Sequence, residues 1–288
     1  MDRGERLLRK VTAGEIEEAV RRLAGEAAVD LPPDVEEALR RALREEAHEL
    51  GRYALEQIVE NAETARRERI PLCQDTGYFT VFLECGPGVL LPPRLREAVD
   101  LGVAAATRQA YLRPSVVEDP HLHRVNTRDN TPVQLHLEQA AEGETVRLTV
   151  MPKGGGSENA SMLRMMLPTA SREEIVQTVV EHVRGKAPYA CPPVVVGVGL
   201  GGSADTCVLA AKRSLLRELG EPCPDGAYAD LERELLERIN RTGIGAAGFG
   251  GAHTALAVHL QPLPTHIALL PLAVAVSCHA LRRKTAEL

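Results

Sequence analysis

The sequence contains no tryptophan, and its aromatic residues are limited to three phenylalanines and five tyrosines among 288 residues. Proteins that bind single-stranded nucleic acid stack the bases on aromatic side chains, so this class is disfavoured. The net charge of −6 likewise disfavours a general polyanion binder, although it permits a local basic pocket. Hydrophobic residues make up 44% and charged residues 26%, which excludes collagen-like and wholly disordered chains.

The sequence also lacks a hydrophobic run long enough to cross a membrane. The longest candidate, residues 267–276, is interrupted by Pro271 and predicts a buried strand. The first residues are charged and lack the apolar core of a secretory signal, so we expect a cytoplasmic protein. No repeat or linker is evident, and we expect a single domain over residues 1–288.

The hydrophobic pattern changes near residue 68. Residues 1–68 predict a helical N-terminal part, with a clear helical period over residues 33–67. In residues 69–288 we expect strands at 78–83, 133–137, 145–151, 194–198, 254–260 and 266–276. Helices are expected at 93–110, 159–167, 171–184, 204–219 and 228–240. This mixture favours an α/β fold, with α+β as the alternative.

The six cysteines form no CxxC pair, which excludes the zinc-ribbon and ferredoxin patterns. In a cytoplasmic chain of this size we do not expect a disulfide framework. Cys73, Cys191 and Cys278 share a context, because each lies at a strand–loop junction among glycine, proline or polar residues. Three thiolates from distant segments can hold an iron–sulfur cluster. The alternative is that they are small buried residues of the core.

Three polar segments carry more functional groups than a core requires. Residues 71–77 (PLCQDTG) combine a thiol, an amide, a carboxylate and a hydroxyl, although a strand-entry turn is the alternative. Residues 124–132, with Arg113 upstream, predict either a carboxylate-binding arginine clamp or a plain polar loop. Residues 151–159 place three glycines before a helix, which favours an anion-binding turn over a flexible connector.

A fourth segment, residues 197–202, fits the GxGxxG pattern of dinucleotide-binding proteins. An NAD-dependent dehydrogenase is therefore an alternative function. However, the helix expected from residue 204 runs into a second helix, and the next strand of a βαβ unit is not where that fold requires it.

Six motifs occur in a defined order along the chain: PLCQDTG, RVNTRDNTP, PKGGGSENAS, CPPVVVGVGLGG, GIGAAGFGG and PTHIALLPLAVAVSCHA. Together they resemble the alpha (catalytic) subunit of the iron–sulfur hydro-lyases, the family of class I fumarate hydratase and L-tartrate dehydratase. The resemblance extends from about residue 5 to residue 284. It implies reversible addition of water to a small dicarboxylate, between fumarate and malate or from tartrate to oxaloacetate.

The resemblance also implies a [4Fe–4S] cluster and assigns roles to residues of this sequence. The cluster ligands would be Cys73, Cys191 and Cys278. The dicarboxylate would be held by Gln74, Asp75, Arg113 and the backbone of Gly156. Asp75 or His266 would handle the proton on the hydroxyl side. Arg128 stands where the family often has glycine, and Ala252 and His253 replace a small polar stretch.

A second, smaller domain supplies part of the active site in that family, either fused or as a separate subunit. Because this chain ends soon after Cys278, we expect the split form, with a beta subunit that completes the site. A heterodimer or an α2β2 assembly would result, with no nucleic-acid or membrane partner. The alternative from another class is a non-catalytic binding or scaffold protein that retains the fold.

Overall fold

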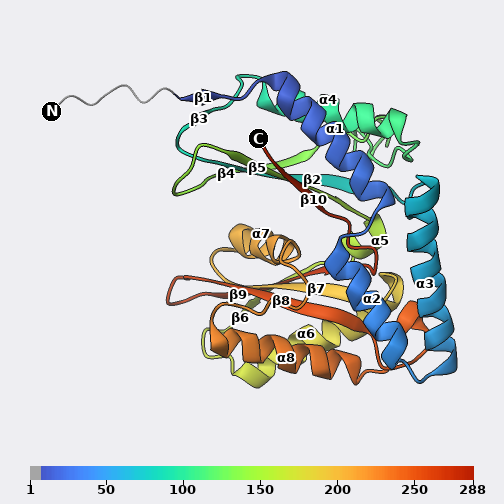
Figure 1. The fold of residues 1–288 in the computed structure, drawn as a ribbon. Coiled ribbons are helices and arrows are strands. Elements are labelled where there is room, and N and C mark those ends of the chain that lie inside the picture. Colours follow the sequence, from blue (N-terminus) through green and yellow to red (C-terminus); the bar gives the residue numbers. More distant parts are fainter. Residues whose placement is uncertain (1–7) are drawn as a thin grey trace. The chain divides into compact units, whose positions relative to one another are not determined.

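The computed structural model describes residues 8–288 and confirms a mixed α/β fold (Figure 1). Its contacts divide the chain into two compact units. The first unit comprises Met1–Pro32, Thr64–Lys153 and Arg282–Leu288, and the second comprises Pro33–Glu63 and Gly154–Leu281. Among the helices of the described part, none is both long and apolar enough to cross a membrane.

The first unit is built on a four-stranded sheet in the order β10-β5-β2-β4. The central strand β2 (Tyr78–Cys85) runs parallel to β4 (Gln134–Gln139) and antiparallel to β5 (Val146–Lys153). The C-terminal strand β10 (Lys284–Glu287) pairs with β5 at the edge. A separate short pair joins β1 (Arg9–Lys10) and β3 (Val89–Leu90) in parallel.

Two helices of the first unit, α1 (Ala13–Val29) and α4 (Leu95–Gln109), pack side by side on this sheet (Figure 1). Their apolar faces share one core with the strands, in which Ile16, Val99 and Phe79 are fully or almost fully buried. Thr12 begins α1 with a capping box to Glu15, which satisfies N–H groups that a helix start leaves without partners.

The second unit contains a four-stranded sheet in the order β6-β9-β7-β8. The strand β7 (Val194–Gly201) lies parallel to β8 (Ala255–Leu263) and antiparallel to β9 (Leu270–Ser277). The edge strand β6 (Met162–Met166) is antiparallel to β9. The helices of this unit include α2 (Pro33–Glu45), α5 (Gly155–Glu158), α6 (Arg172–Lys186), α7 (Ala204–Ser214) and α8 (Gly226–Asn240), with short 3-10 turns at Ala187–Tyr189 and Ala246–Gly248. The long helix α3 (Glu49–Glu68) runs from the second unit into the first.

Alternate residues of β7 face two different layers of the second unit. Val196 and Val198 belong to the core with α6 and α8, whereas α7 lies on the other face (Figure 1). A Cβ atom on Gly197 would come within 2.1 Å of the Ala211 carbonyl oxygen, and one on Gly199 within 2.1 Å of the Cys207 carbonyl oxygen. The first glycines of the GxGxxG pattern therefore allow α7 to pack directly against the strand, which gives them a structural explanation.

The helix expected over residues 159–167 is wrong. Helix α5 ends at Glu158, and the following residues form β6 instead. Leucine and methionine favour helices, but the ladder with β9 provides backbone hydrogen bonds and side-chain packing that outweigh this weak preference. The helix expected from residue 204 ends early, at Ser214, and the helical pattern over 33–67 is divided into α2 and α3.

Candidate active site

The motif cysteines are Cys73, Cys191 and Cys278. Two of them, Cys191 and Cys278, lie together beyond the ends of two neighbouring strands in the second unit's sheet. Cys191 precedes β7, and Cys278 directly follows β9. Because these strands are antiparallel, with Val195 opposite Ser277, the start of one meets the end of the other. The backbone N–H of His279 donates to the Cys191 carbonyl oxygen at 3.2 Å, which fixes the two segments to each other.

The six cysteines divide by exposure in the same way as they divide by motif. Cys191 is exposed, and Cys73 and Cys278 are partly exposed, whereas the other three are buried: Cys85, Cys207 and Cys223. Burial raises the pKa of Cys207 to about 11 and also raises that of Cys85. Metal ligation requires a thiolate, so these two buried thiols are poorly suited to it. The accessible set coincides with the motif set.

Cys191 adopts a backbone conformation that non-glycine residues rarely use. Its φ angle is +52°, in the left-handed region. Such strain is found where the surrounding structure needs a side chain in a particular direction, and often at functional sites. The exposed thiol at the end of a rigid strand is consistent with that use.

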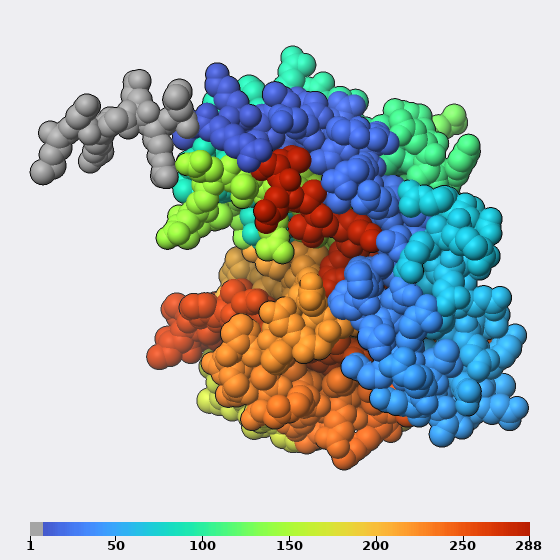
Figure 2. Space-filling view, in the orientation of Figure 1, coloured from blue at the N-terminus to red at the C-terminus, as the bar shows by residue number. Residues whose placement is uncertain are grey.

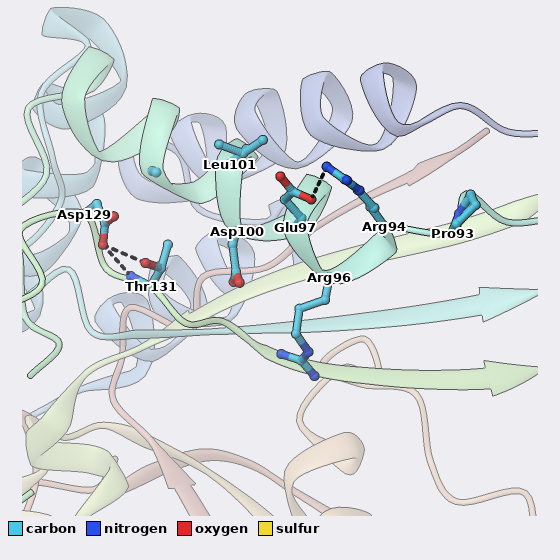
Figure 3. A pocket seen from close by; sticks show the side chains of 9 residues that line it. Pro93, Arg94, Arg96, Glu97, Asp100, Leu101, Asp129 and Thr131 are labelled. Atoms are coloured by element: carbon cyan, nitrogen blue, oxygen red, sulfur yellow. Dashed lines mark hydrogen bonds and ion pairs between the residues drawn. The ribbon is translucent and has the colours of Figure 1, made fainter. Parts of the chain in front are cut away.

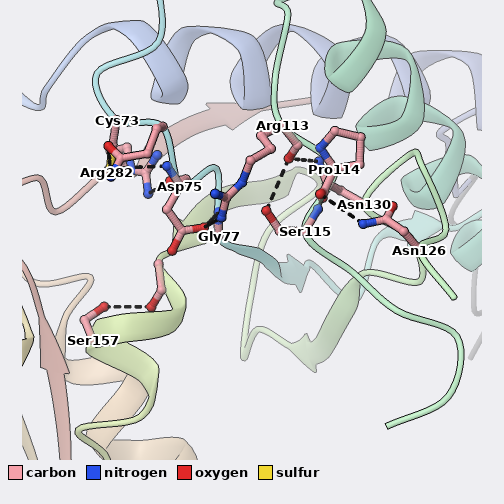
Figure 4. A network of polar contacts seen from close by, with 12 residues as sticks. Cys73, Asp75, Gly77, Arg113, Pro114, Ser115, Asn126, Asn130, Ser157 and Arg282 are labelled. Carbon is pink, nitrogen blue, oxygen red and sulfur yellow. Dashed lines mark hydrogen bonds and ion pairs between the residues drawn. The ribbon is translucent and has the colours of Figure 1, made fainter. Parts of the chain in front are cut away.

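In the first unit, Cys73 lies in a compact polar loop before β2 (Figure 4). The Cys73 sulfur accepts the N–H of Asp75 at 3.4 Å. One carboxylate oxygen of Asp75 accepts the Gly77 N–H at 3.0 Å and lies 3.2 Å from Nη2 of Arg113. The loop therefore holds a thiol and a carboxylate beside the guanidinium of Arg113, while the adjacent Gln74 side chain is exposed.

Asn130 fixes the segment that carries Arg113. Its side chain is fully buried, and its Nδ2 donates to the Arg113 carbonyl oxygen at 3.2 Å and to Thr107 Oγ1 at 3.1 Å. Its Oδ1 accepts the N–H of Ser115 at 2.6 Å. Sequence reasoning placed Asn130 in a polar loop without a role, and its position in the motif NTRDNTP is the signal that could have identified it.

Arg282 is a second residue that sequence reasoning missed. Its side chain is almost fully buried, and its Nη2 donates to the carbonyl oxygen of Asp75 at 3.1 Å (Figure 4). Asp75 is thus held from two sides, by Arg113 at its carboxylate and by Arg282 at its backbone. The sequence signal is a pair of arginines, Arg282 and Arg283, one residue after the last motif.

Of the remaining predicted residues of the second unit, Gly156 lies beside the segment before Cys191, since a Cβ atom on it would come within 3.1 Å of the Tyr189 carbonyl oxygen. Gly156 is exposed in the short helix α5. His266 is exposed in the turn between β8 and β9, which projects from the surface in Figure 2. The eight residues of β9 separate His266 from Cys278, a length of roughly 25 Å at the rise of an antiparallel strand. One second unit therefore does not bring His266 to its own cysteine pair.

A pocket of about 500 Å³ in the first unit, beside the start of α4, contains none of the predicted site residues (Figure 3). Its charged side chains already have partners, since Arg94 pairs with Glu97 and Arg96 donates to the Val133 carbonyl oxygen. Asp100 accepts the Val133 N–H. The contacts of Arg96 and Asp100 with Val133 support the loop before β4, and the Arg94–Glu97 pair lies within the start of α4.

Taken unit by unit, the described residues hold no group of three histidine, cysteine or acidic side chains that could bind a metal ion. The second unit contributes two accessible cysteines at one sheet edge, and the first contributes one, beside Asp75. Thiolate sulfur is the donor type that holds iron–sulfur clusters in proteins.

Comparison with known proteins identifies the family of the chain. The fumarate hydratase (fumerase) family model matches residues 17–287. The putative L(+)-tartrate dehydratase subunit alpha of Methanocaldococcus jannaschii is 39% identical over 274 residues, which cover 93% of this chain and 96% of that protein. The L(+)-tartrate dehydratase subunit alpha of Escherichia coli K12 is 30% identical, over 88% of this chain and 84% of that protein. The chain belongs to the fumarate hydratase family.

Proposed function

We propose that this chain is the alpha subunit of a hydro-lyase that adds water to, or removes it from, a small dicarboxylate. The observation that carries the proposal is the exposure of the cysteines: three remain accessible, and two of these meet at one sheet edge. In the proposal, Cys73, Cys191 and Cys278 together hold a [4Fe–4S] cluster. Membership of the fumarate hydratase family supports the reaction class.

Three cysteine ligands leave one iron of such a cluster with an open position, which supplies Lewis-acid chemistry at the substrate hydroxyl. The residues of this chain orient the substrate. Arg113, whose side chain is 58% exposed, offers a bidentate fork to a carboxylate. Gln74 and the backbone of Gly156 would add contacts to the dianion, so that the reacting atoms begin close to the required geometry.

Asp75 is the group of the first unit best placed to hold or pass on a proton at the hydroxyl. Its carboxylate already contacts Arg113, and the Cys73 sulfur accepts its N–H. A substrate bound by Arg113 beside Cys73 would therefore bring its hydroxyl near this carboxylate. In the proposal the proton on the neighbouring carbon is removed by a base on the partner subunit.

In the proposal, His266 does not act at the cysteine pair of its own chain. It is separated from Cys278 by the full length of β9, which exceeds the length of any four-carbon dicarboxylate. If His266 serves the reaction, as the motif implies, it does so at the site of another copy of this chain. An α2β2 assembly would supply that copy, whereas a single heterodimer would not.

The names of the relatives support two further parts of the proposal. Both relatives are described as a subunit alpha, which supports a separate beta subunit that completes the site. Both are described as tartrate dehydratases, so L-tartrate is the first substrate to test, with fumarate and malate beside it.

The test is anaerobic reconstitution with iron and sulfide, followed by iron and sulfide analysis of single cysteine variants. We expect Cys73→Ser, Cys191→Ser and Cys278→Ser each to lose the cluster, and Cys85→Ala and Cys223→Ala to retain it. Turnover of L-tartrate and fumarate is then measured with and without the partner. A wild-type chain that takes up no cluster, or a Cys73→Ser variant that retains a full one, would overturn the proposal.

A further inference from the structure

A buried carboxylate lies beneath the glycine-rich loop of the second unit. Glu46 follows α2, and its side chain is only 1% exposed. Its carboxylate accepts the N–H of His48 at 2.9 Å and the N–H of Ala252 at 2.8 Å, and it lies 3.2 Å from Nδ1 of His253. Burying a charge is unfavourable unless it is paired and hydrogen-bonded, so these contacts keep Glu46 in place.

The loop above it, residues 243–251 (the glycine loop), closes on itself. The N–H of Gly250 donates to the Ile244 carbonyl oxygen at 2.8 Å. A Cβ atom on Gly245 would come within 1.8 Å of the Gly250 carbonyl oxygen, and one on Gly251 within 2.6 Å of a Glu46 carboxylate oxygen. Both glycines have a positive φ angle. The backbone therefore lies directly on the carboxylate, with no side chain between them.

The other side of the glycine loop holds the segment that carries Cys191. The N–H of Ala247, at the tip of the loop, donates to the carbonyl oxygen of Pro192 at 2.8 Å. Pro192 follows Cys191 directly, and the Cys191 carbonyl oxygen accepts the N–H of His279. The exposed cysteine is thus held from two directions, by the glycine loop through Pro192 and by the end of β9.

We propose that Glu46 is a positioning residue for Cys191, and that it acts through the glycine loop. The proposal rests on the proposed function, in which Cys191 is a cluster ligand. It also gives His253 a role, because the ring of His253 contacts Glu46. The replacement of a small polar stretch by Ala252 and His253 then supports the loop rather than selecting the dicarboxylate.

Glu46→Gln tests the proposal because glutamine keeps the size but not the charge. Its amide can accept only through one oxygen, and its NH2 group would face the N–H of Ala252 or His48. The matched control is Glu45→Gln, since Glu45 is the adjacent residue, lies 3.5 Å from His253 Nε2 and has a side chain that is 59% exposed.

Amide hydrogen exchange of the chain without a cluster is the first measurement, because it does not depend on cluster uptake. In Glu46→Gln we expect the amides of Ala247 and His279 to exchange about tenfold faster, as for a local opening that loses a charged hydrogen bond. The amides of β7 should keep their protection, whereas general destabilisation would accelerate them too. Glu45→Gln should match the wild type throughout.

Iron release from the anaerobically reconstituted chain to a chelator is the second measurement. We expect release from Glu46→Gln to be about tenfold faster than from wild type and Glu45→Gln, the same factor as local opening. If Glu46→Gln does not fold, His253→Ala removes only one of the three contacts and should give the same pattern with a smaller effect. Unchanged exchange at Ala247 and His279 in the folded variant would overturn the proposal.

The two proposals fail in different ways. A wild-type chain that binds no iron contradicts the proposed function, whatever the exchange data show. A wild-type chain that binds a cluster, with a Glu46→Gln variant that releases iron at the wild-type rate, contradicts only the positioning role.

Discussion

The carbonyl oxygen of Cys191 lies 3.2 Å from the backbone nitrogen of His279 and 3.0 Å from its ring Nδ1. One residue therefore holds the peptide that follows Cys191 and is itself the neighbour of Cys278. Because the contact joins the start of β7 to the end of β9, the separation of the two cysteines is set by the strand register rather than by a flexible loop. If the proposed function holds, the two cysteines are already positioned before a cluster binds.

A change at Cys207 should affect stability but not iron content, and a change at Cys191 should affect iron content but not stability. Cys207 is fully buried against β9, so Cys207→Ala should lower the free energy of unfolding by about 1–2 kcal/mol and leave iron uptake unchanged. Cys191 is exposed, so Cys191→Ser should abolish iron uptake with a stability change within about 0.5 kcal/mol. Denaturant unfolding and iron analysis check both. A loss of iron in Cys207→Ala would contradict the assignment of the ligands.

Arg113→Lys should lower kcat/KM by a factor that corresponds to about 2–3 kcal/mol of lost transition-state stabilisation, measured with the partner present. Lysine keeps the positive charge but loses the planar fork that binds a carboxylate through two hydrogen bonds. Arg94, whose side chain is 80% exposed and pairs with Glu97, lies outside this segment, and Arg94→Lys serves as the control. A wild-type kcat/KM for Arg113→Lys on every dicarboxylate tested would remove Arg113 from the site.

The sequence predicted the elements that position Cys191 and Cys278, because β-branched runs next to glycine and proline mark buried strands and their ends. It did not predict β6, whose one leucine and three methionines favour a helix until β9 provides a partner. The sequence also did not single out Glu46, because it is one of many charged residues in an amphipathic helical pattern. Only the tertiary fold shows that its carboxylate is buried while that of Glu45 is exposed.

The stability of the first unit should depend on pH through Asp30. Burial alone would raise the pKa of Asp30, but hydrogen bonds from Lys284 and Arg66, both at 2.6 Å, outweigh it and the pKa is lowered. A lowered folded-state pKa stabilises the fold above the usual value near 3.8, and this contribution is lost as the pH falls through the folded value.

Asp30→Asn should therefore lower the free energy of unfolding at pH 7 by about 1–3 kcal/mol. The difference from the wild type should shrink in denaturant titrations repeated at decreasing pH below about 4. Glu68→Gln, at an exposed residue of the same unit, is the control. A difference that stays constant into acid would show that the ionised carboxylate is not the stabilising group.

Arg128→Gly should stabilise the protein by about 0.5–1 kcal/mol. Arg128 has a φ angle of +67°, and its side chain is exposed, so the arginine carries the strain of the left-handed region without a packing gain. Arg128→Ala keeps the strain and should match the wild type. Thermal unfolding of the three proteins decides the matter, and stabilisation by alanine equal to that by glycine would contradict the strain argument.

Two inactive variants should restore each other's activity if His266 acts at the site of another copy. His266→Asn alone should lose about 10²–10⁴-fold in turnover, as for a general acid or base, and Cys278→Ser alone should lack the cluster. In an assembly with one copy of each, one site combines an intact cysteine set with an intact His266, while the other site has neither. Mixed assemblies isolated with two different tags, in the presence of the partner, should show about half the wild-type turnover.

The control combines two variants of the same site, Cys191→Ser and Cys278→Ser, which give no intact site in any combination. Because β9 separates His266 from Cys278 in one chain, the absence of activity in the first mixture would leave His266 without a place in the reaction.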